Sequence, residues 1–126
     1  MFDIHAAAIE AAIHDCAIVA TYNLNTVQLS PNTAYLEGEV FFTDGSRLVF
    51  FEFLRSALTS LNREKYRYHF MDASNQLVFR YDNAPHHPKI ATFPHHKHRP
   101  TGVADSLAPR FEQVLVEIEA HVLGIL

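Results

Sequence analysis

The sequence has almost no cysteine and no long apolar run. Cys16 is the only cysteine among 126 residues, which excludes an internal disulfide and a zinc site built from several cysteines. The longest purely apolar stretches, such as residues 48–51, are short, whereas a membrane-spanning helix needs about 20 residues. The first residues carry acidic side chains and no basic cluster, so we expect no signal peptide. These absences favour a cytoplasmic protein that does not cross a membrane.

The sequence also lacks internal repeats, low-complexity tracts and an evident linker. With 48% hydrophobic and 19% charged residues, it has the length and composition of one globular domain with a single core. We therefore expect one domain over residues 1–126. Its expected parts are an N-terminal helix, a β-meander, a segment rich in histidine and proline, and a C-terminal helix, over residues 1–16, 17–82, 83–105 and 106–126.

The central part of the sequence has the residue types and turns of an antiparallel sheet. Segments rich in Val, Ile, Thr, Tyr and Phe alternate with turn residues. The clearest hairpin signal is Asp44-Gly45, because a type I′ turn needs positive φ at both central positions. Residues 55–63 fit a loop or a short helical turn. Short connections predict a meander of about five antiparallel strands, at residues 18–28, 34–42, 47–54, 66–71 and 76–81.

Helices are expected at both ends of this sheet. Residues 3–14 are rich in alanine and carry apolar side chains near helical spacing. From about Ala108, one apolar stripe predicts an amphipathic helix; it consists of Phe111, Val114, Leu115, Ile118 and Val122. The stripe needs a partner, and the aromatic face of the sheet offers one. The predicted fold class is α+β, with a single antiparallel sheet and both helices packed on it.

Acidic residues are scarce in one part of the sequence. Residues 63–100 hold seven basic residues against three acidic ones, although the net charge of the whole chain is −4. Six of the nine histidines lie in the same part, so its positive charge grows below neutral pH. Such a surface suits phosphates or acidic partners. The plainer alternative is a solvated sheet face that happens to be basic.

The densest group of chemically active side chains lies in residues 80–99, RYDNAPHHPKIATFPHHKHR. This segment holds five histidines, His86, His87, His95, His96 and His98. Prolines at 85, 88, 94 and 100 fix φ and push the preceding residues toward extended geometry, so we expect a stiff, irregular segment. Imidazole changes its charge near neutral pH and is the commonest metal ligand, which makes this segment the expected functional site.

Several motifs here resemble those of a known family. Tyr68-His69-Phe70, the strand-turn-strand to Phe79, and the sequences RYDNAPHH at 80–87 and FPHHKH at 93–98 resemble the signature of the TumE family. Its members are toxin components of bacterial and archaeal toxin-antitoxin pairs. The resemblance extends more weakly to the hairpin at 44–46 and to the C-terminal helix, and the motifs do not predict the N-terminal helix. It implies a small cytosolic toxin that a cognate antitoxin neutralises, and it implies no particular reaction.

Metal-free RNA cleavage is the first hypothesis for the chemistry of these residues, and it requires no cofactor. Attack by a 2′-hydroxyl needs a base, an acid for the leaving oxygen, and fixed positive charge on the phosphate. We assign His96 and His98 to proton transfer and Arg80 to the phosphate, with His87 and Asp82 completing the catalytic set. Five residues are expected to bind the substrate through charge or base stacking, namely Arg67, Tyr68, Tyr81, Lys97 and Arg99.

A divalent metal site is the rival hypothesis. Alternate residues of an extended segment share a face, so His96 and His98 should point the same way. Either His86 or His87, with Asp82, can complete the ligand set of a metal-dependent hydrolase, and we favour His87. His86 and His95 are the residues we expect to brace the irregular segment through hydrogen bonds.

A third hypothesis is a non-catalytic module that binds nucleic acid or protein. An enzyme predicts that Arg80, Asp82, His87, His96 and His98 converge within hydrogen-bond reach, whereas a binding module predicts that they disperse. Arg67 and His69 share one face of the predicted fourth strand and are expected to border the same site. Long edge strands in a small sheet are also consistent with a homodimer.

Overall fold

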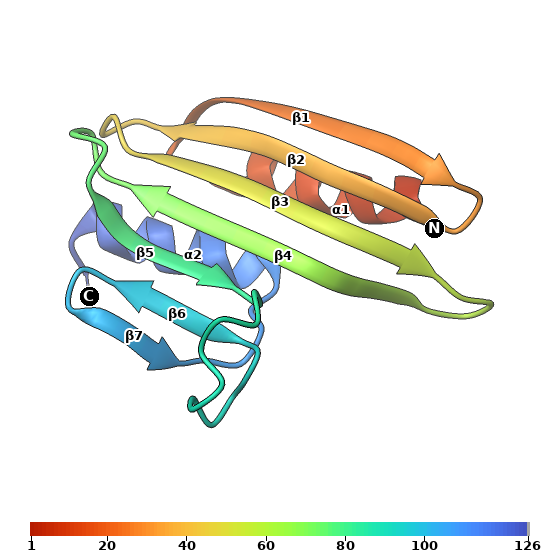
Figure 1. The fold of residues 1–126 in the computed structure, drawn as a ribbon. Helices are drawn as coiled ribbons and strands as arrows, with labels where there is room; N and C mark the ends of the chain where they lie inside the picture. Colours follow the sequence, from red (N-terminus) through yellow and green to blue (C-terminus); the bar gives the residue numbers. More distant parts are fainter. Residues whose placement is uncertain (126) are drawn as a thin grey trace.

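A computed structural model describes residues 1–125 of the chain. These residues form two helices and seven strands (Figure 1), in the order α1 (Phe2–Asp15), β1 (Val19–Ser30), β2 (Thr33–Phe42), β3 (Arg47–Ser56), β4 (Leu61–Met71), β5 (Leu77–Asp82), β6 (His96–Arg99), β7 (Gly102–Asp105) and α2 (Phe111–Leu123). The strands form one sheet in sequence order, and every neighbouring pair is antiparallel. The α+β meander is thus confirmed. Neither described helix has the length and apolar character needed to cross a membrane.

Both helices lie behind the same face of the sheet, with α1 behind β1 to β3 and α2 behind β4 to β6 (Figure 1). Alternate residues of the central strands, such as Leu36, Phe50 and Tyr68, are fully buried on this side. The ring of Phe111 in α2 packs against Phe50, with 4.9 Å between ring centroids. We call this side the helix-covered face. The opposite side, which neither described helix covers, is the open face.

The hairpin between β2 and β3 is present, but its turn is not type I′. Gly45 has a φ of 86°, whereas Asp44 is not among the described residues with positive φ. The N–H of Gly45 donates to the carbonyl of Phe42 at 3.0 Å, and the N–H of Phe42 donates to the carbonyl of Ser46 at 2.9 Å. This pattern matches a three-residue loop that ends in a left-handed glycine. The Asp44 carboxylate accepts the N–H of Ser46 at 2.9 Å, and this hydrogen bond explains why an acidic residue suits this position of the turn.

The expected strand count is wrong because the segment at 83–105 is not irregular throughout. Its last part forms β6 and β7, and β6 pairs with β5. Pro94 and Pro100 flank β6 and do not interrupt it, so neither removes a hydrogen-bond donor from the ladder. Residues 83–95 form the irregular loop that was predicted, and β4 begins at Leu61, within the segment left open between loop and helical turn.

Candidate functional site

The pairing of β5 with β6 brings the first part of the site together. Arg80 lies opposite His98, and Asp82 lies opposite His96. Directly opposed residues of an antiparallel pair project to the same face, and residues two apart in a strand do so as well. These four side chains therefore meet on the open face at the end of β5.

Asp82 stands at the centre of this group. One carboxylate oxygen, Oδ1, lies 2.9 Å from Nε2 of His96 and accepts the N–H of Ala84 at 3.0 Å. The other, Oδ2, accepts Nε–H of Arg80 at 2.9 Å and lies 3.5 Å from Nε2 of His98. Asp82 is only 3% exposed, so the loop and the neighbouring strands remove its carboxylate from water. The convergence expected of an enzyme is therefore present at these residues.

A backbone carbonyl group fixes the orientation of the His96 ring. Its Nδ1 lies 2.8 Å from the carbonyl oxygen of Pro94, which can only accept, so Nδ1 carries a proton. Its Nε2 consequently faces the site, 3.1 Å from Nε2 of His98. At 2% exposure, His96 is almost completely buried, whereas the side chain of His98 is 29% exposed.

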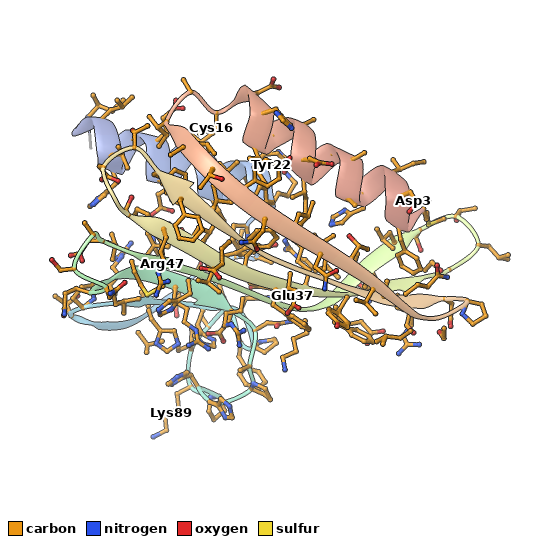
Figure 2. All side chains as sticks on the ribbon, turned by 90° about the horizontal axis from the view of Figure 1, so that it is seen from above. Asp3, Cys16, Tyr22, Glu37, Arg47 and Lys89 are labelled. Carbon is orange, nitrogen blue, oxygen red and sulfur yellow. The ribbon has the colours of Figure 1, made fainter. Side chains whose placement is uncertain are left out.

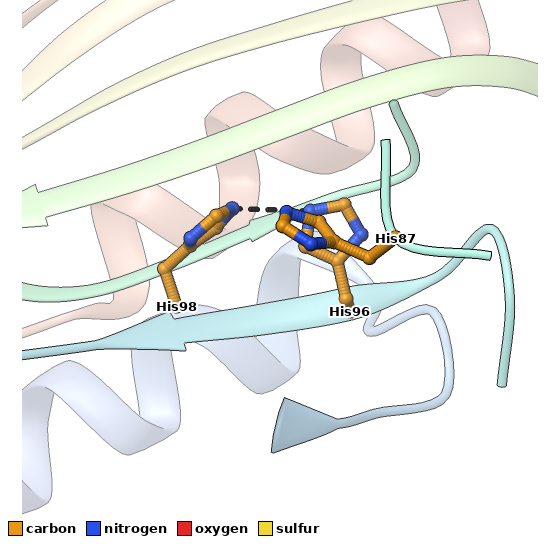
Figure 3. Close-up of side chains that lie close together, drawn as sticks. All are labelled: His87, His96 and His98. Atoms are coloured by element: carbon orange, nitrogen blue, oxygen red, sulfur yellow. Dashed lines mark hydrogen bonds between the residues drawn. The ribbon is translucent and has the colours of Figure 1, made fainter. Parts of the chain in front are cut away.

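The loop at 83–95 adds His87 to the group. Its ring lies edge-on to the rings of His96 and His98, with centroids 4.9 and 5.6 Å away (Figure 3). Each of the three histidines offers a ring nitrogen within 4.8 Å of the other two. Of the two histidines considered as third ligand, His87 is the one that reaches this position, while His86 is exposed. We call Arg80, Asp82, His87, His96 and His98 the Asp82 cluster.

Two side chains of β4 border this cluster on the open face. Arg67 in β4 lies opposite Asp82, and His69 lies opposite Arg80, so both border the cluster as expected. Burial lowers the pKa of His69, and the charges of Arg80, Arg67 and Arg47 lower it further. Burial also lowers the pKa of His98, the Asp82 carboxylate opposes this shift, and His96 and Arg80 add to it. Both shifts favour the neutral form of the imidazole.

Residues 9–123 match the family model described as Toxin TumE. This range covers nearly the whole chain and includes every member of the Asp82 cluster. The chain belongs to the TumE toxin family. Comparison with curated proteins and with solved structures finds no match. Family membership makes the protein a toxin, for which the expected partner is an antitoxin. The match begins within α1, so the N-terminal helix is in part a family feature.

Four predicted substrate-binding residues of the toxin lie on the helix-covered face, away from the Asp82 cluster. Tyr68 is fully buried on the helix-covered face, where its hydroxyl donates to Glu52. The Tyr81 hydroxyl and the Lys97 ammonium both donate to Glu117 of α2, each at 2.6 Å. Arg99 lines a hollow on the same side, next to Glu117. Since side chains alternate along a strand, residues one position away from Arg80, Asp82, His96 and His98 had to point toward the helices.

The loop at 83–95 is braced by its neighbours. The Tyr66 hydroxyl and Nδ1 of His95 lie 2.9 Å apart, and the two rings are stacked. The Asn83 side chain accepts the N–H of Tyr66 at 3.1 Å and donates to the carbonyl of Glu64 at 2.9 Å. The bracing role predicted for His95 agrees with this geometry. The loop projects away from the helices, with Lys89 near its tip (Figure 2).

A second group of polar residues in the toxin was not predicted. Glu52 of β3 is 1% exposed and lies 2.6 Å from Nε2 of His5 in α1. The Tyr68 hydroxyl donates to Glu52 and accepts from Nη1 of Arg63 at 2.6 Å. We call Glu52, His5, Arg63 and Tyr68 the Glu52 group. Its one sequence signal is that Glu52 falls between Phe50 and Leu54, at a position of β3 that points into the core.

Proposed function

We propose that the toxin acts on RNA and cleaves its phosphodiester bonds at the Asp82 cluster. The observation that supports this proposal is the convergence of a buried carboxylate, three imidazoles and a guanidinium on the open face. Such a convergence favours catalysis over a non-catalytic binding module, because polar groups that only bind along a surface have no need to meet at one point.

The exposed members of the cluster are placed to meet the substrate. The side chain of Arg80 is 36% exposed and uses Nε for Asp82, which leaves its terminal N–H groups for phosphate oxygens. His98 is the histidine of the β5–β6 pair that solvent reaches. His96 is too buried to touch a phosphate, so in this proposal it is a positioning residue that Pro94 and Asp82 hold in place.

The open face beside the cluster suits a single strand of RNA. Phe51 lies opposite Arg67, and its ring is stacked with that of Tyr35, 5.8 Å between centroids. Half-buried aromatic rings next to basic side chains are typical of surfaces that bind single-stranded nucleic acid through stacking and charge. Arg67 lies between this aromatic pair and Asp82, so a single-stranded RNA bound here runs toward the cluster.

The test is cleavage of a labelled single-stranded RNA by the purified toxin, with the same strand made of DNA as a substrate lacking 2′-hydroxyls. We expect the RNA to be cleaved and the DNA to remain intact. His98→Ala should lower the rate by about 100-fold or more, the usual cost of losing a group at the reacting centre. His86→Ala is the matched control and should leave the rate unchanged, because His86 is an exposed histidine outside the cluster. Intact RNA, or an unimpaired His98→Ala variant, would overturn the proposal.

A further inference from the structure

We infer that His87, His96 and His98 bind one divalent transition-metal ion, with zinc as the best-matched common metal. The inference concerns the site of the proposed function, but it rests on the arrangement of three imidazoles and does not require RNA as the substrate. It names the cation that the cluster holds.

The arrangement of hydrogen-bond acceptors carries the argument. Because Nδ1 of His96 donates to Pro94, Nε2 has a lone pair whenever the ring carries a single proton. That lone pair faces a carboxylate oxygen of Asp82 at 2.9 Å and Nε2 of His98 at 3.1 Å. Nε2 of a neutral His96 and Oδ1 of Asp82 are both acceptors, so a proton or a metal ion has to lie between them. A proton on His96 satisfies one contact, whereas a metal ion satisfies the nitrogens of all three histidines.

The distances are close to those of a metal site. Two nitrogens bound to a tetrahedral zinc ion, each about 2.0 to 2.1 Å from it, lie about 3.3 Å apart. The nitrogens of His96 and His98 are already 3.1 Å apart, and the offered nitrogen of His87 is within 4.8 Å of both. His96 and His98 are fixed by the β5–β6 pairing, while His87 lies in the loop and can close the remaining distance.

The ligand type selects the metal. Three imidazole nitrogens suit zinc and its transition-metal neighbours, whereas magnesium and calcium prefer oxygen ligands. A metal-bound histidine almost always donates its second nitrogen to a carbonyl or carboxylate, as His96 does to Pro94. Three protein ligands also leave a fourth position for water or a substrate oxygen, which is typical of catalytic zinc sites.

The experiment titrates chelator-treated, tag-free toxin with Co²⁺, followed by visible absorption, and then with Zn²⁺ as a competitor. We expect one ion per chain, an absorption band of four-coordinate Co²⁺, and its loss when Zn²⁺ displaces the ion. His87→Ala and His98→Ala should each weaken binding at least about tenfold, since loss of even an outer partner of a ligand costs that much. His86→Ala is the neighbouring control and should bind like the wild type.

Absence of one-to-one binding would overturn the inference, and so would equal affinities of the His86→Ala and His87→Ala variants. Circular dichroism of each variant shows whether it is folded. If a variant is unfolded, the titration of the wild-type toxin alone tests the inference. RNA cleavage measured on the same samples separates the two proposals. Metal binding without RNA cleavage removes only the proposed function, whereas cleavage by a toxin that binds no metal removes only the inference.

Discussion

The Glu52 group and the Asp82 cluster are built from similar residues and differ in how many histidines meet beside the carboxylate. Each centres on a carboxylate that is at most 3% exposed and contacts an arginine and a histidine. Around Glu52, the Tyr68 hydroxyl and the His5 ring are available as donors. Around Asp82, Arg80 and the N–H of Ala84 donate to the carboxylate, and ring nitrogens of three histidines lie within 4.8 Å of one another.

The two groups also occupy opposite faces of the sheet. The Glu52 group lies on the helix-covered face, where His5, Glu52 and Arg63 are among the residues that line a hollow of about 300 Å³ between α1 and α2. The Asp82 cluster lies on the open face with Arg80 and His98 partly exposed. Residue type alone therefore does not separate a structural polar group from a functional one. The number of imidazoles that meet does, because three ring nitrogens lie together at the Asp82 cluster and one lies beside Glu52.

Removal of Glu52 should have the largest effect on stability. Glu52→Ala leaves the fully buried Tyr68 without its acceptor and the partly buried Arg63 without its carboxylate, and we expect the free energy of unfolding to fall by about 3 to 5 kcal/mol. Asp82→Ala should cost only about 1 to 2 kcal/mol, because Arg80 can turn to water. Urea denaturation of both variants measures the difference. A larger loss for Asp82→Ala would reverse the roles given to the two carboxylates.

Arg80→Lys should impair activity with little effect on folding. A lysine keeps the charge but loses the planar set of donors that holds Asp82 and a phosphate together. We expect RNA cleavage to fall about tenfold, equivalent to about 1.4 kcal/mol of transition-state stabilisation. The midpoint of urea denaturation should stay close to that of the wild type. Wild-type cleavage rates in this variant would show that Arg80 is not the phosphate ligand.

A change on the helix-covered face should have a smaller effect on cleavage. Lys97→Met removes the ion pair with Glu117 but leaves the open face unchanged. We expect a cleavage rate within about twofold of the wild type and a stability loss of about 1 to 3 kcal/mol, because Lys97 is only 8% exposed and Glu117 loses its partner. A strong loss of cleavage by the folded variant would mean that the helix-covered face takes part in function.

The smallest effect concerns the ionisation of buried tyrosines. Burial raises the pKa of Tyr66 to about 12, and burial together with the Glu52 charge raises the pKa of Tyr68 well above its usual value. A raised pKa in the folded state means that the associated stability is present below pH about 10, where unfolded tyrosines are protonated, and is lost as pH rises toward 12. Ultraviolet titration should show Tyr68 ionising at lower pH in Glu52→Gln. Tyrosines that all titrate together near pH 10 would contradict the described burial.

The sequence predicted most of the fold because its strongest patterns are local. The amphipathic stripe predicts α2 and the alternation predicts β4, and both patterns involve only residues that are close in the sequence. The strand β6 was missed because its formation depends on pairing with β5, and the prolines around it suggested irregular structure. The face to which each side chain of β6 points was nevertheless predictable from the alternation along a strand. His96 and His98 point to one face, so Lys97 had to point to the other.

The members of the Asp82 cluster were predictable, but the difference in exposure between His96 and His98 was not. The spacing of His96 and His98 and the proximity of Asp82 followed from strand geometry. The burial of His96 depends on how the loop at 83–95 folds over it, which no periodic pattern encodes. The Glu52 group joins residues 47 positions apart, His5 and Glu52, and such a contact is set by the packing of α1 on the sheet.

Growth of cells that express the toxin without its antitoxin tests the central claim most directly. We predict that induced wild-type toxin and His86→Ala arrest growth, whereas His98→Ala, expressed at the same level and folded, does not. Full growth arrest by His98→Ala would contradict the assignment of the toxin's activity to the Asp82 cluster.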